Sequence, residues 1–254
     1  MTFIYYTHNA KPRDFMLGIY DRNVDMANRL GARFIAVVAE PFSDTDVVVP
    51  FDPEPKYLDI YRRILTGLRL VKDEMEPVYM LEDDVLYPDE HFNMEMRGDL
   101  LVYQMHFAFM DRQGFFRIPR GNIALSQVFG TKRALMWNYT KKFDECQGRR
   151  MACCEPAGPE YRTATASHEN MPCIDIRNGL NATWTGESAR ARPDTTVHET
   201  LPGWAPWPIL WDRYCGCLSP TCAMCGGTRR VDMPFDGTVE TVHAWTECPM
   251  CKGV

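Results

Sequence analysis

The sequence predicts an α/β protein with a mostly parallel sheet, because short apolar runs alternate with amphipathic segments of helical period. Residues 3–6 are aromatic and β-branched, and residues 34–39 are almost continuously apolar, as in strands covered on both faces. Between them, apolar side chains recur at helical spacing over residues 17–27, and Gly31 stands where that helix should end. The chain therefore opens with a strand, a helix and a second strand.

A second amphipathic helix is predicted over residues 56–75, with Pro77 after it and a buried strand from Val78. This strand runs directly into the acidic triplet Glu82-Asp83-Asp84. Ligands of parallel α/β sheets bind beyond the carboxyl ends of the strands. The triplet is therefore the first candidate for a functional site.

The later part of the chain mixes strands and loops. We expect strands at residues 100–107 and 114–118, a strand and then a helix over 123–139, and a loop-rich segment at 140–172. Residues 173–177 alternate between apolar and charged side chains, which places Asp175 and Arg177 on one face of a further strand.

Composition restricts the class of protein. With 254 residues, 45% hydrophobic and 24% charged, the chain resembles an ordinary globular protein rather than a disordered or fibrous one. No apolar run is long enough to cross a bilayer, and residues 1–6 lack the basic segment of a signal peptide, so we expect a cytoplasmic protein.

Charge is distributed unevenly along the chain. Residues 1–100 hold 11 Lys and Arg against 19 Asp and Glu, which leaves 17 against 15 for residues 101–254. The second part is therefore compatible with a polyanionic partner such as nucleic acid, although the net charge of the whole chain is -6.

The acidic triplet has a metal-binding interpretation. If strand geometry persists, Glu82 and Asp84 point to one side and Asp83 to the other. Two carboxylates on one side can bind Mg²⁺ or Mn²⁺, which completes its shell with substrate phosphates and water. The alternative is an exposed acidic turn that binds no metal.

The first strand runs into Thr7-His8-Asn9, an amphipathic helix follows it, and residues 81–85 have the form of an acidic DXD motif. With these features, residues 1–200 resemble the GT-A-fold glycosyltransferases, and the strand Asp175-Ile176-Arg177 with the Asn and Thr residues after it is similar to segments of phage-encoded members. The resemblance implies a Rossmann-like mixed sheet flanked by helices. It also implies transfer of a sugar from a nucleotide sugar, most typically a UDP-sugar, in the host cytoplasm if the enzyme is phage-encoded.

The resemblance also implies residue roles. Asp84 would be a direct metal ligand, Glu82 would lie nearer the sugar or ribose, and a late histidine, His198, would complete the metal site. Glu82 departs from the family pattern, where aspartate is more usual. The donor-binding residues implied are Thr7, His8, Asn9, Glu82, Asp83 and Asp84.

A diphosphate leaving group also needs a cationic donor, and Arg177 is the candidate. If the reaction inverts the anomeric carbon, a carboxylate must take the acceptor's proton, and Asp175, Glu155 and Glu160 are candidates. A retaining enzyme would need no such base. A structural ion pair between Asp175 and Arg177 is the alternative interpretation.

The last part of the chain predicts a zinc site. Two C-x2-C turns, Cys222 with Cys225 and Cys248 with Cys251, can place four thiolates around one tetrahedral Zn²⁺. We expect domains at residues 1–208 and 209–254, the second a small zinc ribbon. Cys215 and Cys217 are further candidate zinc ligands: they either form a second site, with Cys146, Cys153, Cys154 or Cys173 as partners, or replace one of the two C-x2-C turns.

Zinc ribbons are frequent in nucleic-acid enzymes, and Arg229, Arg230 and Lys252 lie in this one. We therefore expect DNA modification, with 5-hydroxymethylpyrimidine in bacteriophage DNA as the acceptor. The alternatives are a glycosyltransferase acting on a glycan or protein, a nucleotidyltransferase, and a non-catalytic zinc protein that binds nucleic acid.

Overall fold

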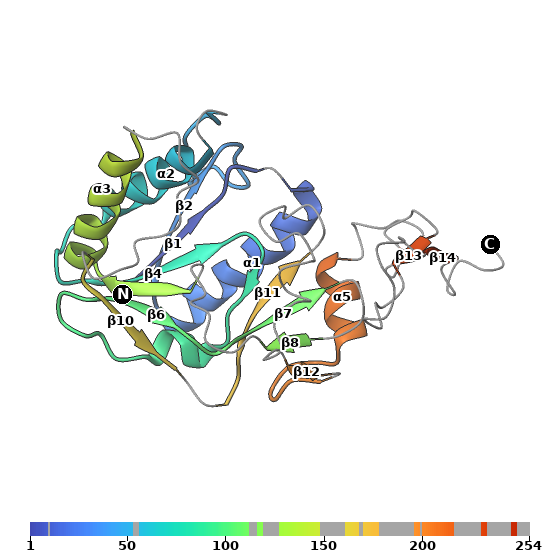
Figure 1. The fold of residues 1–254 in the computed structure, drawn as a ribbon. Coiled ribbons are helices and arrows are strands. Elements are labelled where there is room, and N and C mark those ends of the chain that lie inside the picture. Colours follow the sequence, from blue (N-terminus) through green and yellow to red (C-terminus); the bar gives the residue numbers. More distant parts are fainter. Residues whose placement is uncertain are drawn as a thin grey trace.

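The structure is a computed structural model that describes the following residues: 1–9, 11–52, 56–111, 116–118, 127–147, 161–167, 170–177, 196–198, 200–215, 230–232 and 245–247. A mixed sheet of seven strands forms its centre, in the order β10-β6-β9-β4-β1-β2-β3 (Figure 1). The strands are β1 (Thr2–Tyr6), β2 (Arg33–Val38), β3 (Val47–Val48), β4 (Pro77–Glu82), β6 (Leu101–Gln104), β9 (Val128–Thr131) and β10 (Thr163–Ala166).

Most neighbours in this sheet are parallel. β1 pairs in parallel with β2 and β4, β2 with β3, and β6 with β10, whereas β9 runs antiparallel to both β4 and β6. The described residues thus confirm the predicted α/β class, with one antiparallel strand inserted in a parallel sheet.

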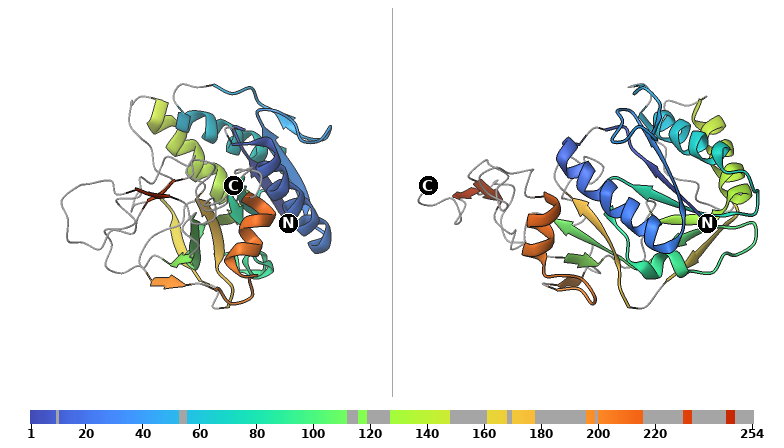
Figure 2. Two further views of the ribbon diagram at one scale, coloured as in Figure 1. Left: turned by 90° about the vertical axis from the view of Figure 1, so that its right-hand side faces the viewer. Right: turned by 180° about the vertical axis from the view of Figure 1, so that it is seen from behind.

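Helices cover both faces of the main sheet. The helices of the described residues are α1 (Arg13–Leu30), α2 (Lys56–Leu70), α3 (Lys132–Gln147), α5 (Trp207–Cys215), which packs against α1, and the short 3-10 helix η1 (Asp89–Asn93). α2 and α3 lie side by side on one face, and α1 lies across the other (Figures 1 and 2). Side chains of β1 alternate accordingly: Phe3 and Tyr5 pack on the α1 side, and Ile4 and Tyr6 on the α2 side.

Two glycines meet specific backbone requirements. Gly31 has a left-handed backbone, with φ of 61°, and its N–H caps the last turn of α1, which confirms the predicted helix end. Gly67 lets α2 approach the sheet closely, because a Cβ at that position would lie 2.6 Å from the side chain of Ile4.

A second sheet of five strands extends the fold, in the order β12-β8-β7-β11-β5. These strands are β5 (Val85–Leu86), β7 (Phe107–Asp111), β8 (Phe116–Ile118), β11 (Cys173–Arg177) and β12 (Thr196–His198). β11 is parallel to β7 and antiparallel to β5. The strand predicted at residues 173–177 is therefore confirmed, and Ile174 and Ile176 are fully buried.

The structure also corrects some boundaries. The run at 100–107, expected as one strand, is divided between β6 of the main sheet and β7 of the second. The side-chain amide of Gln104 bonds both the N–H and the C=O of His106, which fixes the change of direction. The segment expected to be loop-rich, 140–172, contains the end of α3 and the strand β10.

Helix α5 follows the proline-rich segment near the expected domain boundary. Leu210, Trp211 and Tyr214 are buried in the same core as α1, and Trp204 donates a hydrogen bond to the carbonyl of Pro172. Farther along, β13 (Arg230–Asp232) and β14 (Trp245–Glu247) pair antiparallel. The division at 208 stays a prediction. No helix of the described ranges is both long and apolar enough to span a membrane.

Candidate functional site

The carboxyl ends of β1 and β4 lie side by side at a topological switch point. From β1 the chain passes through α1 to β2 on one side, and after α2 it returns to β4 on the other side of β1. The two strands end in register, with Tyr6 opposite Glu82. In open α/β sheets such a point is where ligands bind, because the loops diverge there and leave a crevice.

The acidic triplet forms the junction between the two sheets. The main sheet ends at Glu82, Asp83 and Asp84 form a turn, and β5 of the second sheet begins at Val85. The N–H of Ile176 donates to the carbonyl of Asp84 at 2.8 Å, so strand β11 is bonded directly to the turn.

Because Asp83 and Asp84 lie in a turn, their carboxylates point in other directions than they would if the strand continued. Glu82 accepts a hydrogen bond from the hydroxyl of Tyr6 at 2.7 Å, and its N–H donates to the hydroxyl of Tyr87 at 3.0 Å. Asp83 and Asp84 converge on one cation instead. The expected pairing of Glu82 with Asp84 on one side is wrong, because strand geometry ends at Glu82.

The cation is the ammonium of Lys11, from the loop after β1. Its Nζ contacts Asp83 Oδ1 and lies 2.9 Å from Asp84 Oδ2. The second oxygen of Asp83 accepts a hydrogen bond from the hydroxyl of Thr7. All three charged side chains are almost enclosed, with Asp83 6%, Asp84 5% and the Lys11 side chain 8% exposed.

These charges fix the protonation of neighbouring groups. Burial acts to lower the pKa of Lys11, but the two carboxylates outweigh it and raise that pKa above its ordinary value. Burial, with Asp83 and Asp84, raises the pKa of Tyr5, and burial with Glu82 raises that of Tyr6. Lys11 is therefore a cation and both phenols are neutral.

Two other residues of the loop after β1 have different roles: Asn9 binds backbone groups, and His8 contacts an exposed aromatic ring. Asn9 has a left-handed backbone, with φ of 56°, and its side-chain oxygen accepts from the N–H groups of Ala39 and Glu40. His8 instead stacks on Phe51, with ring centroids 5.7 Å apart and planes inclined by 27°. Phe51 is 48% exposed. The sequence did not predict a role for Phe51, and the one indication of it is an aromatic residue after the expected β-α-β opening.

Strand β11 places Asp175 beside the acidic turn, because Asp175 is opposite Val85 in the ladder. Its side chain is 6% exposed, so it is not at an open sheet surface. The backbone of Arg177 is opposite Asp111 on β7, and the Arg177 side chain lies outside the described part.

His198 lies elsewhere. It is on β12, at the opposite edge of the second sheet from β5, and is paired with Phe116. Four strand spacings of about 4.8 Å separate these edges, so the structure does not bring His198 to the acidic turn. Across the described ranges, no group of three or more His, Cys, Asp or Glu side chains is arranged to hold a metal.

The remaining predicted residues are mostly beyond the described part of the chain. Cys215 ends α5, and its side chain is not described. Cys146 is disulfide-bonded, and Cys173 is a buried thiol whose pKa is raised by burial. Neither is a free surface thiolate ready for zinc. The predicted residues outside the described ranges are Glu155, Glu160, Cys153, Cys154, Cys217, Cys222, Cys225, Arg229, Cys248, Cys251 and Lys252, and of Arg230 only the backbone is described.

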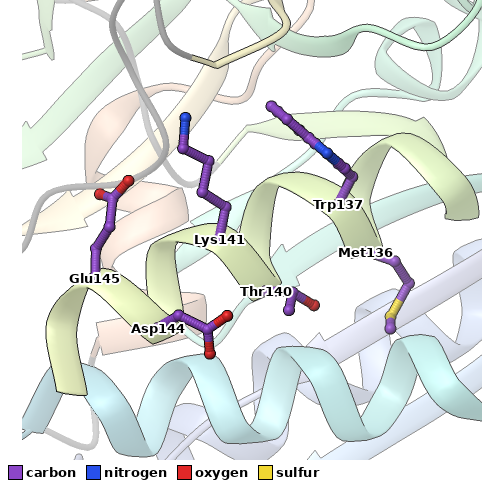
Figure 3. A pocket seen from close by; sticks show the side chains of 6 residues that line it. All are labelled: Met136, Trp137, Thr140, Lys141, Asp144 and Glu145. Atoms are coloured by element: carbon purple, nitrogen blue, oxygen red, sulfur yellow. The ribbon is translucent and has the colours of Figure 1, made fainter.

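An open hollow of about 590 Å³ lies along α3 (Figure 3). Lys141 is placed over the rings of Trp137 and Tyr161, at 5.4 and 4.7 Å from their centroids. None of the predicted site residues lines this hollow. Its lining consists of Met136, Trp137, Thr140, Lys141, Asp144 and Glu145.

Comparison with solved structures finds similarity to a viral protein, described as a glycosyltransferase involved in the glycosylation of the major capsid of PBCV-1. The two are 10% identical, with a TM-score of 0.43, over 74% of this chain and 97% of that one. No protein-family model and no curated protein matches the sequence. At this level of similarity, no residue role is transferred from that protein to this chain.

Proposed function

We propose that this protein is a glycosyltransferase that moves a sugar from a nucleotide-sugar donor to an acceptor hydroxyl. The observation that carries the proposal is the convergence of Asp83, Asp84 and Lys11 at the switch point between β1 and β4. Buried charges of both signs at a ligand-binding edge suit a diphosphate and its counter-ion.

The donor's base is proposed to stack on the rings of His8 and Phe51. These rings lie beside the loop that carries Lys11, and Phe51 is half exposed. An exposed aromatic platform accepts any base through its π-face. A UDP-sugar is the donor we propose, with its diphosphate near the acidic turn.

A divalent ion, Mn²⁺ or Mg²⁺, is part of the proposal. Asp83 and Asp84 already direct carboxylate oxygens at one cationic group, and such oxygens are the ligands these ions prefer. We propose that Asp83 and Asp84 hold the ion, with Glu82 bonded to Tyr6 as a support. When bound, the ion would neutralise charge that develops on the departing diphosphate.

Asp175 is proposed as the base if the reaction inverts configuration. The acceptor oxygen would form a bond to the anomeric carbon, the bond to the diphosphate oxygen would break, and the acceptor's proton would pass to Asp175. Support comes from the position of Asp175 on the strand that bonds the acidic turn, and from its burial. A retaining reaction would leave Asp175 with a structural role.

The acceptor proposed is 5-hydroxymethylpyrimidine in DNA, and its support is the sequence. The paired C-x2-C turns with Arg229, Arg230 and Lys252 suit a zinc module that contacts a polyanion. The target base would have to be flipped or locally opened for its hydroxyl to enter an active site.

Mass spectrometry of products tests this function. The protein is incubated with Mn²⁺, a panel of nucleotide sugars, and either hydroxymethylated or unmodified DNA. A mass gain of one sugar on hydroxymethylated DNA alone is expected. A gain on a glycan or protein instead would change the acceptor, and pyrophosphate release from a nucleoside triphosphate and a sugar phosphate would indicate a nucleotidyltransferase. Salt-dependent DNA binding without any donor turnover would indicate a non-catalytic protein.

A further inference from the structure

Lys11 occupies the space between the carboxylates that would hold the divalent ion. Its Nζ contacts Asp83 Oδ1 and lies 2.9 Å from Asp84 Oδ2, while Thr7 takes the other oxygen of Asp83. The Lys11 side chain is only 8% exposed. The ammonium therefore engages oxygens that the ion would need.

Two cations cannot share these oxygens. A Mg²⁺-type ion binds carboxylate oxygens at about 2.1 Å, which would place it against the ammonium. Repulsion between them would be strong, because the site is almost closed to water. Lys11 must leave its two partners when the ion enters.

The departing ammonium needs a new anionic partner. Lysine carries a compact charge on a flexible four-carbon stem, so Lys11 can move without a change in the fold. A charge left without a partner in a buried site is strongly unfavourable. The donor's diphosphate would bring anionic oxygens to the same edge, where they can accept hydrogen bonds from the ammonium.

We propose that Lys11 couples binding of the divalent ion to binding of the donor's diphosphate. The ion alone must displace the ammonium from its two carboxylate partners without supplying a new one. The ion and the diphosphate together replace both of the contacts that Lys11 gives up. This inference rests on the proposed function, and it assigns Lys11 a positioning role in donor binding.

Calorimetric titration of Mn²⁺ with and without UDP tests the coupling. In the wild-type protein we expect UDP to tighten Mn²⁺ binding at least about tenfold, within the usual range of coupling between sites. In Lys11→Met, Mn²⁺ should bind without UDP at least about tenfold more tightly than to the wild type, and UDP should tighten Mn²⁺ binding less than it does in the wild type, because only the direct contact between ion and diphosphate remains.

A matched variant controls for general loss of positive charge. Lys132 is ion-paired with Glu74 and its side chain is only 12% exposed, so Lys132→Met removes a similarly enclosed charge and should keep the wild-type coupling. Lys11→Arg retains a cation and should also retain the coupling. If Lys11→Met does not fold, Lys11→Gln, which removes the charge but keeps a polar side chain, takes its place.

The possible results distinguish a failure of the coupling role of Lys11 from a failure of the proposed glycosyltransferase function. If Mn²⁺ and UDP both bind the wild type but do so independently, the coupling role is overturned while the proposed function stands. Equal coupling in the wild type and in Lys11→Met overturns it as well. If neither ligand binds the wild type, the inference and the proposed function both fail.

Discussion

Lys11 Nζ lies 2.9 Å from Asp84 Oδ2, and the two residues come from the loops that follow the adjacent parallel strands β1 and β4. The pair joins the two sides of the topological switch point. Because Asp83 contacts the same ammonium, one lysine balances two neighbouring carboxylates.

Asp84→Asn should nearly abolish sugar transfer. The change keeps the shape of the side chain but removes one of two charges at the proposed ion site, and such electrostatic losses reduce turnover by about a hundredfold or more. Steady-state transfer assays in Mn²⁺ buffer measure this, with circular dichroism as a check of folding. Asp99→Asn is the matched control, because Asp99 forms an exposed ion pair with Arg133. Full activity in Asp84→Asn would exclude the acidic turn from the site.

Phe51→Ala should weaken donor binding without affecting the chemical step. Loss of a stacking platform typically costs about 1–3 kcal/mol per base, so KM for the donor should rise by a factor of about 5 to 160 while kcat stays nearly constant. Val48→Ala, at an equally exposed position on β3, should leave both unchanged. A fall in kcat with an unchanged KM would place the base elsewhere.

Gly67→Ala should destabilise the protein by about 1–3 kcal/mol, because the added methyl group would lie 2.6 Å from Ile4 and force α2 away from the sheet. Urea denaturation measures the free energy of unfolding. Gly18→Ala in α1 is the control: its nearest neighbour, Tyr214, is 3.8 Å away, so helix propensity should make it neutral or stabilising by up to about 1 kcal/mol. Equal effects would refute the steric explanation.

Asp89 should contribute a small pH-dependent stability. The hydrogen bonds and charge of Arg29 lower the pKa of Asp89 below its ordinary value of 3.8. The contribution is therefore present above that value and is lost as the pH falls through the lower folded pKa. Since both side chains are more than half exposed, Asp89→Asn should reduce stability at pH 7 by less than about 1 kcal/mol. Thermal unfolding at several pH values measures this, and the difference should shrink at high salt.

Local patterns identified much of the scaffold. The apolar runs and the helical spacing predicted β1, α1, β2, α2 and β4 nearly at their observed positions. This succeeds because the buried face of a strand or helix is formed by residues close together in sequence. The same logic placed Glu82 at the end of a central strand. It also placed Gly31 at the end of α1, where the left-handed backbone of this glycine ends the helix.

The sequence by itself determined the class of fold and the edge of the sheet at which acidic side chains gather. Only the tertiary structure decided which groups meet there: a turn after Glu82 directs Asp83 and Asp84 to Lys11, and Asn9 binds the backbone after β2 so that His8 meets Phe51. It also placed His198 at the far edge of the second sheet. The physical reason is that the spacing of hydrophobic residues shows which face of each strand or helix is buried. The direction of a polar side chain depends on turns and on strands that are distant in sequence.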